Sequence, residues 1–409
     1  MEQAVHFTER HHVQPDAVDS SSPNGTQPAS TVSPEASVSA AKQYAKIKLT
    51  LSLVGSLLFF ILSLALVAGG ATALLEGFVR SFLVNDYLAL LGFAALLGLA
   101  EMLLTLPLQF YSGFYLEHKY NLSNQSLRAW LWERLKGLLV SIPITVPLLL
   151  ALFFCLKSFG SWWWLPVGSV LFFVSVVLAR LAPVLIFPLF YRFKPLPDGP
   201  LKSTVLRLCQ SVGMSVEGVY VFDMSKNTKK ANAAFTGIGK SKRIILGDTL
   251  VANFRDDEIE TVFAHELGHY KLKHIRTMMV IGTVSSFLGL YLTARAYEIS
   301  LPWFGFATPD RLAALPLLAM WLGVYSLVAG PLTNAISRAH ERAADRYSIG
   351  LTGNAEAFAN ALRKLASINL ADVSPHPVVE FLFHSHPSVE KRLRALEGTG
   401  DASRAGRAS

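Results

Sequence analysis

Residues 49–75 read LTLSLVGSLLFFILSLALVAGGATALL and contain no charged side chain, so this stretch alone indicates a membrane protein. A helix needs about 20 consecutive apolar residues to cross the hydrocarbon core of a bilayer, and this run exceeds that length. Five further runs meet the same criterion: Tyr87–Leu108, Leu138–Leu156, Trp162–Leu189, Met278–Ala296 and Leu312–Pro331. We therefore expect a mainly α-helical integral membrane protein with about six transmembrane helices.

The composition agrees with a chain that lies in a lipid bilayer. Of 409 residues, 52% are hydrophobic and 16% are charged, whereas soluble domains carry about 25% charged residues. The net charge of +8 fits basic loops beside membrane spans, and the chain has no nucleic-acid-binding motif, so we expect no nucleic-acid partner. The two cysteines, Cys155 and Cys209, are too few for a disulfide framework or a cysteine metal cluster.

Six spans place both chain ends and the polar region between the fourth and fifth spans on one side of the membrane. Loops on the cytoplasmic side carry an excess of Lys and Arg. The basic residues that flank spans on this side are Lys42, Lys46, Lys48, Lys119, Arg128, Arg134, Lys136, Arg192, Lys194 and Lys202. The opposite side carries only Arg80, Lys157, Arg295 and Arg311. We therefore expect both termini and the polar region to be cytoplasmic.

The chain divides into membrane and polar segments on this basis. The predicted divisions are a disordered tail (1–45), a membrane domain with four spans (46–192), a first polar segment (193–275), two further spans (276–333), a second polar segment (334–396) and a disordered tail (397–409). Short β-rich runs at Val219–Phe222, Ala231–Thr236 and Arg243–Leu246 predict a small sheet in the first polar segment. The polar segments together are expected to form one small α+β domain.

A helix predicted over Asp256–His274 contains the motif His265-Glu266-Leu267-Gly268-His269. Its two histidines are four residues apart, so they project from one helical face and can hold one Zn²⁺ at about 2.0–2.1 Å. Glu266 lies beside the metal but points away from it, so it can accept a proton from the attacking water and pass it to the leaving amine. The pattern is that of zinc proteases, although a histidine pair on a polar helix face is the alternative.

Catalytic zinc requires a third protein ligand, and the segment Asn334–Asp345 offers a candidate. Glu341 can bind the metal, while Asp345, four residues on, can accept a hydrogen bond from a ligating imidazole and fix its orientation. His340 is a rival ligand, but it projects about 100° away from Glu341 around the helix. An ordinary solvated helix is the alternative reading of this segment.

Several stretches together resemble the membrane-embedded CAAX prenyl proteases of the zinc metallopeptidase family M48. They are Leu116–Gln125, Ala182–Leu196, Val219–Gly237, Asn334–Asp345 and the C-terminal residues His386, Pro387 and Arg392. The resemblance implies that the helices surround a large chamber faced by the metal centre. It also implies one Zn²⁺ per chain, Glu341 as third ligand, Asp345 as its companion and a function in CAAX-box protein processing.

Substrate handling involves two further segments. We expect Asn232, Ala233, Ala234 and Phe235 to form an edge strand that pairs with the backbone of an extended peptide, the alternative being a buried structural strand. His386, in a Ser-His-Pro turn, is the candidate donor to the oxyanion that develops during hydrolysis. Arg392 is a second candidate for binding substrate. A capped turn and a surface arginine are the respective alternatives.

The chain also departs from the eukaryotic members of the family, which have seven spans. It ends Arg-Ala-Ser without an obvious retrieval signal, so we expect a protein of a bacterial inner membrane. The predicted function is zinc-dependent metalloendopeptidase, with the C-termini of lipidated (CAAX-type) or membrane-associated peptides as candidate substrates. The alternatives are a membrane-protein quality-control protease and a non-catalytic scaffold with a structural metal, which would have no use for Glu266.

Overall fold

The computed structural model describes residues 34–236 and 243–405. The tail predictions for residues 1–33 and 406–409 lie outside the described residues. Six helices in the described part are long and apolar enough to cross a membrane, which confirms the predicted number. They are built on α1 (Pro34–Ala68), α3 (Asp86–Phe110), α5 (Leu127–Ser158), α6 (Trp164–Leu181), α11 (His274–Ser300) and α12 (Leu315–Thr352).

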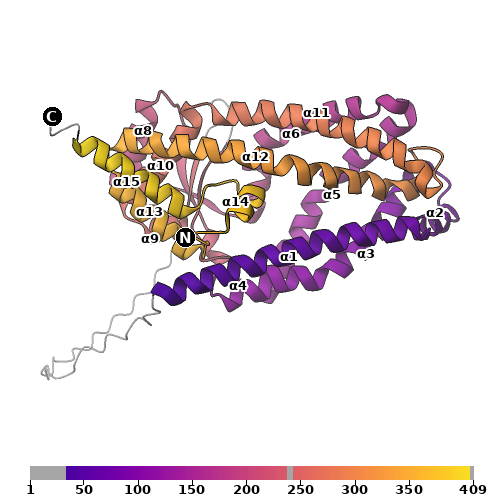
Figure 1. The fold of residues 1–409 in the computed structure, drawn as a ribbon, viewed down its shortest axis with the longest axis horizontal. Coiled ribbons are helices and arrows are strands. Elements are labelled where there is room, and N and C mark those ends of the chain that lie inside the picture. Colours follow the sequence, from indigo (N-terminus) through magenta and orange to yellow (C-terminus); the bar gives the residue numbers. More distant parts are fainter. Residues whose placement is uncertain (1–33, 237–242, 406–409) are drawn as a thin grey trace, which may run out of the picture.

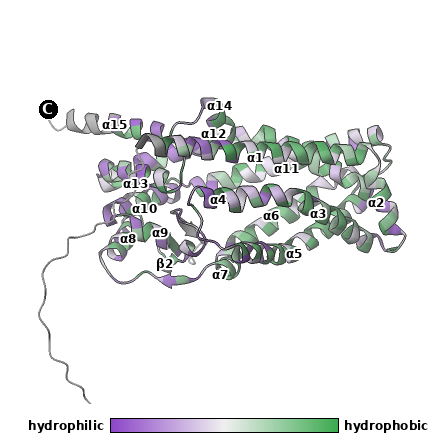
Figure 2. Ribbon diagram, turned by 90° about the horizontal axis from the view of Figure 1, so that it is seen from below, coloured by the Kyte–Doolittle hydropathy of each residue, from purple (hydrophilic) through white to green (hydrophobic). Residues whose placement is uncertain are grey.

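Two of these helices continue through π-helical turns. α3 passes through η1 (Tyr111–Tyr115) into α4 (Leu116–Lys119), and α6 passes through η3 (Ala182–Ile186) into α7 (Phe187–Phe190). Short 3-10 turns lie at Gly160–Trp162, Met224–Lys226, Leu301–Phe304 and Leu312–Ala314. In Figure 2 the long helices are coloured mostly as hydrophobic residues, whereas the end of the molecule with α8, α10 and α13 contains many hydrophilic ones, as expected for a bundle inside lipid with one domain outside it.

The six long helices form a closed ring. α1 packs on α3, α3 on α5, α5 on α6, α6 on α11, α11 on α12, and α12 returns to α1. α1, α11 and α12 run along the long axis of the molecule in Figure 1. The contacts therefore close the six helices into a ring, and the predicted chamber inside it stays a prediction.

The first predicted span, 49–75, ends too late. α1 stops at Ala68, Gly70 adopts φ +74°, and the separate helix α2 (Ala71–Arg80) follows. The buried carboxylate of Glu76 accepts hydrogen bonds from Arg80, Arg311 and the backbone N–H of Ala313 at 3.0, 3.2 and 3.1 Å. These bonds tie α2 to the connection between α11 and α12 at the end of the ring remote from the polar domain.

Three predicted domain boundaries also need correction. α1 begins at Pro34, inside the predicted tail 1–45, because this stretch is rich in helix-forming Ala and because Ala41 and Tyr44 are buried by packing. α12 runs unbroken through the predicted boundary at 333/334 despite Pro331. α15 (Val389–Ala405) continues past residue 396, so most of the predicted tail 397–409 is helical.

The polar domain contains a four-stranded sheet with the order β1-β2-β4-β3. The strands are β1 (Phe193–Pro195), β2 (Gly218–Phe222), β3 (Ala233–Thr236) and β4 (Arg243–Gly247). β2 and β4 are parallel, whereas β1 with β2 and β3 with β4 are antiparallel. The three predicted strands are present, and β1 was not predicted.

Helices cover this sheet and complete the domain: α8 (Pro200–Ser211), α9 (Asp248–Asn253), α10 (Asp256–Lys271), α13 (Ala355–Ile368), α14 (Pro377–Phe383) and α15. Their shared core includes Val205 from α8, Ile244 and Leu246 from β4, and Ile259 and Leu267 from α10, all nearly inaccessible to solvent. This core fixes α10, which carries the HELGH motif, against the sheet.

Candidate metal centre

The helix that carries the two histidines has a well-defined start and end. At its start the Glu258 side chain accepts the backbone N–H of Arg255 (2.9 Å) and the ammonium of Lys364 (2.7 Å), which satisfies an unpaired donor of the first turn. The predicted helix end at His274 is wrong. α10 stops at Lys271, Lys273 adopts φ +60°, and His274 begins α11.

α10 and α12 cross very closely beside the motif. A Cβ atom on Gly268 would lie 3.1 Å from the Cα atom of Ala344 and 3.2 Å from the Cβ atom of Tyr347. About two turns away on α10 and one turn away on α12, Ser348 Oγ donates a hydrogen bond to the backbone oxygen of Thr261 at 2.7 Å. The glycine of the motif thus lets α12 approach α10 closely enough for a side chain on α12 to reach the histidines.

Three side chains converge at this crossing: His265 and His269 of α10 and Glu341 of α12. The two Nε2 atoms are 3.2 Å apart, and Glu341 Oε2 and Oε1 lie 3.3 Å from His265 Nε2 and 3.2 Å from His269 Nε2. A tetrahedron with metal–ligand bonds of about 2.0–2.1 Å has edges of about 3.3–3.4 Å, so the spacing suits a metal ion. Glu341 Oε2 is also buried without a hydrogen-bond partner, and a metal would satisfy it.

The first ligand, His265, is flanked by a carboxylate and an arginine. Its Nδ1 atom lies 2.8 Å from Asp345 Oδ1, and Arg392 binds both oxygens of Asp345 through Nε (2.8 Å) and Nη2 (2.5 Å). Burial lowers the pKa of His265, but the contacts with Asp345 and Glu341 outweigh this effect and raise the pKa to about 9. Asp345 thus stands where the sequence predicts it.

The second ligand, His269, has an imidazole neighbour that sequence reasoning did not assign to it. His274 Nδ1 lies 3.1 Å from His269 Nδ1, and the His274 ring stacks on His340 with centroids 4.1 Å apart and an interplanar angle of 7°. His340, the rival ligand, therefore lies behind the site and is not a member of the three-residue cluster. Only the left-handed Lys273, which turns the chain between α10 and α11, brings His274 back to the motif.

The remaining predicted residues occupy different positions around the cluster. Burial raises the pKa of Glu266 above its usual range. His386 Nε2 lies 3.3 Å from Glu341 Oε1 while 61% of its side chain is exposed, so it stands on the open side of the site. Arg392 is 12% exposed and engaged with Asp345, a placement that does not support the predicted direct contact with substrate.

The predicted substrate strand lies at the edge of the sheet. β3 contains Ala233, Ala234 and Phe235, pairs with β4 on one side and is the last strand in the sheet order. Asn232 precedes it, and its backbone oxygen accepts the N–H of Gly247 at 2.9 Å. Among the described residues β3 is therefore an edge strand, and its pairing with substrate, as opposed to the role of a buried structural strand, stays a prediction.

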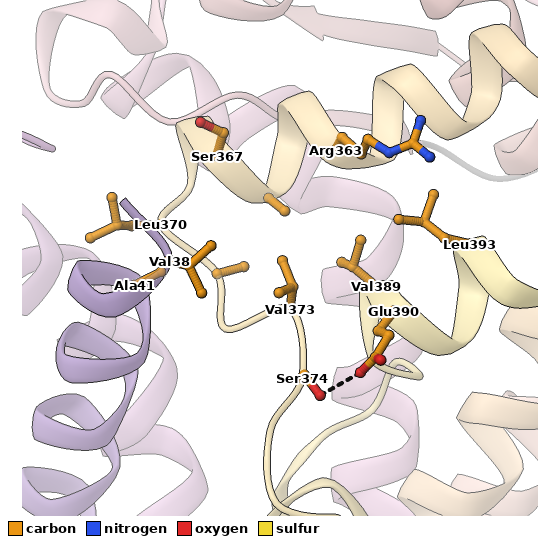
Figure 3. Close-up of a pocket in the computed structure, with 12 residues that line it drawn as sticks. Val38, Ala41, Arg363, Ser367, Leu370, Val373, Ser374, Val389, Glu390 and Leu393 are labelled. Atoms are coloured by element: carbon orange, nitrogen blue, oxygen red, sulfur yellow. Dashed lines mark hydrogen bonds between the residues drawn. The ribbon is translucent and has the colours of Figure 1, made fainter. Parts of the chain in front are cut away.

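A separate cavity of about 530 Å³ lies outside this cluster, between α1, α13, the segment after α13 and α15 (Figure 3). Its lining is mostly apolar and includes Val38, Leu370 and Leu393, with Ser374 hydrogen-bonded to Glu390 at one side. No predicted site residue lines this cavity, so it is not the metal centre.

Comparison with known proteins places the whole arrangement in a family. Residues 195–400 match the model of peptidase family M48. Residues 21–192 match the model described as the CAAX prenyl protease N-terminal region with five membrane helices. The chain belongs to peptidase family M48. It is therefore a membrane metalloendopeptidase, although its described residues up to Phe190 contain four helices of spanning length rather than five.

Other M48 proteins resemble the chain over most of its length. An uncharacterized metalloprotease of Bacillus subtilis, YhfN, is 32% identical over 91% of this chain and 88% of its own length. The CAAX prenyl protease 1 of Saccharomyces cerevisiae is 32% identical over 78% and 74% of the two chains. The crystal structure of S. mikatae Ste24p superimposes with a TM-score of 0.77 at 28% identity, covering 88% of this chain and 89% of that one.

Proposed function

We propose that the protein holds one Zn²⁺ between His265, His269 and Glu341 and hydrolyses peptide bonds with Glu266 as its general base. The observation that carries the proposal is the spacing of 3.2–3.3 Å among the three ligand groups, together with the buried, unpartnered oxygen of Glu341. Two imidazoles and one carboxylate are a donor set of catalytic zinc, which leaves a fourth position for water or substrate.

Each neighbouring side chain then has a distinct task. A bound zinc ion would polarise the scissile carbonyl and lower the pKa of a water molecule. Glu266 accepts the proton of the attacking water and returns it to the leaving nitrogen, and its raised pKa makes it a better base. Asp345 orients the ring of His265, and Arg392 holds Asp345. His386, on the open side, donates to the carbonyl oxygen as negative charge develops there.

The free edge of β3 is the proposed binding surface for the substrate backbone, over Asn232, Ala233, Ala234 and Phe235. Within residues 34–236 and 243–405 β3 pairs only with β4, so its other edge can accept an extended peptide as an additional strand. Such pairing aligns the peptide along the sheet and brings one of its carbonyl groups to the metal. It does not depend on peptide sequence, because backbone groups alone form the ladder.

The relatives of the chain suggest its substrate class. We infer peptide bonds near the C-termini of lipidated, CAAX-type or other membrane-associated proteins, since relatives from yeast and Arabidopsis thaliana are named CAAX prenyl proteases. The basic residues that flank the spans support a cytoplasmic catalytic domain and cytoplasmic termini. The B. subtilis relative, which covers nearly the whole chain, supports a bacterial inner membrane as the location.

Glu266→Gln tests the catalytic assignment, because the amide keeps the size of the carboxylate but cannot accept the proton. The variant should bind zinc as the wild type does and lose cleavage by about 10²–10⁴-fold. Mass spectrometry of peptides released by the wild type and by the variant would identify the cleaved bonds. Parental cleavage by Glu266→Gln would reject the mechanism.

A matched pair of substrates tests the substrate class separately. A farnesylated CAAX peptide and the same peptide without the lipid should differ in kcat/KM if the lipid is recognised. Equal rates on the two peptides would reject recognition of the lipid and leave a protease of broader specificity, such as one that clears membrane proteins.

A further inference from the structure

The segment Leu116–Gln125 takes no part in the chemistry described above. It contains a carboxylate that makes several contacts between the membrane ring and the polar domain. Glu117, at the start of α4, accepts hydrogen bonds from Tyr44 (2.6 Å) and Lys48 (2.9 Å) of α1. Its other oxygen lies 2.9 Å from the ammonium of Lys230 in the polar domain. Its side chain is only 13% exposed.

The surrounding groups hold the same arrangement from other directions. Lys48 also donates to the backbone oxygen of Ser112 (3.2 Å), which lies in the π-helical turn η1. Lys230 donates to the hydroxyl of Tyr44 (3.0 Å), and the Tyr44 ring packs edge-on against Tyr120. One carboxylate therefore balances two ammonium groups and joins α1, α4 and the polar domain.

The loop after α4 continues the contact as a backbone ladder. The oxygen of Leu122 accepts the N–H of Lys229 (2.9 Å) and the hydroxyl of Thr228 (2.9 Å). Asn124 donates its backbone N–H to the oxygen of Asn227 (3.2 Å) and its side-chain amide to the oxygen of Ser225 (2.8 Å). The membrane ring thus fixes residues 225–230, which lead directly to β3.

Further hydrogen bonds hold the residues between Lys230 and the edge strand β3. The backbone oxygen of Lys230 accepts the hydroxyl of Thr249 (2.7 Å). Ala231 exchanges two hydrogen bonds with the side chain of Asn369, at 2.9 and 3.3 Å. Two residues later β3 begins at Ala233. Because so few residues separate Lys230 from β3, a shift of Lys230 moves the start of the strand.

We propose that Glu117 is a positioning residue that sets the entry of β3, so that the membrane ring determines where a peptide is presented to the metal centre. This inference rests on the proposed function, because it requires β3 to bind the substrate backbone. The side-chain partners of Glu117 are Tyr44, Lys48 and Lys230 and not the residues of the metal cluster, so its effect should fall on peptide binding rather than on the metal.

Substitutions of Glu117 and Lys230 should weaken the contact between the membrane ring and the polar domain to different degrees. Glu117→Gln removes the negative charge and leaves the ammonium groups of Lys48 and Lys230 facing each other without a counter-charge. Lys230→Met removes the tie to the polar domain without creating that repulsion, and it leaves the bonds between α1 and α4 in place. Glu117→Gln should therefore be the more severe change. Lys230→Arg, which keeps the charge, should retain most of the activity.

The dependence of kcat/KM on peptide length distinguishes the proposed role of Glu117 from a purely structural one. The experiment uses the full-length protein reconstituted with zinc and two fluorogenic peptides with the same cleavage site. The long peptide can pair with all four residues of β3, whereas the short one reaches little beyond the scissile bond. Glu117→Gln should lower kcat/KM for the long peptide by roughly tenfold to a hundredfold, as expected for small misplacements, mainly through KM. Cleavage of the short peptide and zinc stoichiometry should change by less than about twofold.

Glu133→Gln is the matched control, because Glu133 is also an ion-paired glutamate of the membrane ring but pairs only within α5, with Lys136. It should behave as the wild type on both peptides. The inference is overturned if Glu117→Gln equals the wild type on the long peptide, or if both peptides lose activity equally. If Glu117→Gln does not fold, the length dependence of Lys230→Met decides. An inactive wild type rejects the proposed function and this inference together, whereas an active wild type with a length-independent Glu117→Gln rejects only the inference.

Discussion

Removing the guanidinium of Arg392 should weaken metal binding rather than peptide binding. Arg392 reaches both oxygens of Asp345 at 2.8 and 2.5 Å, and Asp345 lies 2.8 Å from the ring of His265. Both side chains are about nine-tenths buried, at 12% and 9% exposure, so solvent screens the pair only weakly. Arg392→Met keeps an unbranched stem of similar volume near the backbone and removes both donors.

The expected loss of zinc affinity depends on which contacts Asp345 keeps in the variant. In the variant the carboxylate loses its bidentate partner and is held only by His265, so its orientation is no longer fixed. Loss of such an orienting partner typically reduces metal affinity 10–100-fold, which corresponds to about 1.4–2.8 kcal/mol. Asp345→Asn should produce a loss of the same order. Asp345→Asn and Asp345→Ala both remove the counter-charge of a buried arginine, a change that costs about 3–5 kcal/mol, and Asp345→Ala should be worse for stability because it also removes the oxygen that accepts from Arg392.

A double-mutant cycle distinguishes this role from direct contact with substrate. If Arg392 acts through Asp345, the double variant with Asp345→Asn and Arg392→Met should bind zinc about as weakly as either single variant. Competition with a fluorescent chelator would measure zinc affinity, and saturation kinetics with a cleaved peptide would measure KM. Arg394→Met is the matched control, because Arg394 lies on the same helix and pairs with Glu390 at 73% exposure. A raised KM with unchanged zinc affinity, or losses that multiply in the double variant, would refute the reasoning.

Two further predictions concern the helices that carry the ligands. Gly268→Val should lower stability by at least the ~1–3 kcal/mol typical of overpacking and weaken zinc binding, because its Cβ atom would lie 3.1 Å from the backbone of Ala344. Gly350→Val on α12, where a Cβ atom meets nothing within 4 Å, is the control, and equal melting temperatures and zinc affinities for the two would contradict the packing argument. Glu258→Gln tests the start of α10: although burial alone would raise the pKa of Glu258, Lys364 and the Arg255 N–H hold it below the usual value of 4.5. A carboxyl group whose pKa is lower in the folded state than in the unfolded state stabilises the fold at pH values above its unfolded-state pKa. It loses that contribution as the pH falls through its folded-state pKa. The melting temperature of the wild type should therefore exceed that of Glu258→Gln above about pH 4.5 and converge with it in stronger acid. A difference that persists unchanged into acid would rule out an electrostatic origin.

The parts of the fold that the sequence predicts are those set by local patterns. The six spans follow from apolar runs that no soluble fold would tolerate, and His265, Glu266 and His269 follow from a spacing that has meaning on any helix. The strand at 233–236 was likewise visible as a short run between glycines and polar residues. In each case a few neighbouring residues contain the whole signal.

The parts that could not be predicted depend on contacts between distant segments. Arg392 was a candidate for binding substrate, and its partner Asp345 becomes evident only when α15 brings the two side chains together. His274 was predicted as the last residue of the helix that carries the motif, whereas the left-handed Lys273 ends that helix and returns His274 to His269. The helical start of α1 was hidden by a polar, low-complexity composition, because the burial of Ala41 and Tyr44 depends on partners that lie far along the chain.

The continuity of α12 raises the question of what fixes the third ligand. Glu341 lies 26 residues along the helix from Leu315 (341 − 315), or about 39 Å at 1.5 Å per residue. A site of this kind tolerates displacements of about 0.5 Å, which over that length corresponds to a tilt of less than about one degree. Crossing angles differ by about 15–20° from one packed helix pair to another, so the general packing of the ring does not by itself specify the position of Glu341 to that tolerance. The contact of Gly268 with Ala344 and the bond between Ser348 and Thr261, both within two turns of Glu341, must therefore set the metal geometry, while the ring only brings α12 within their reach.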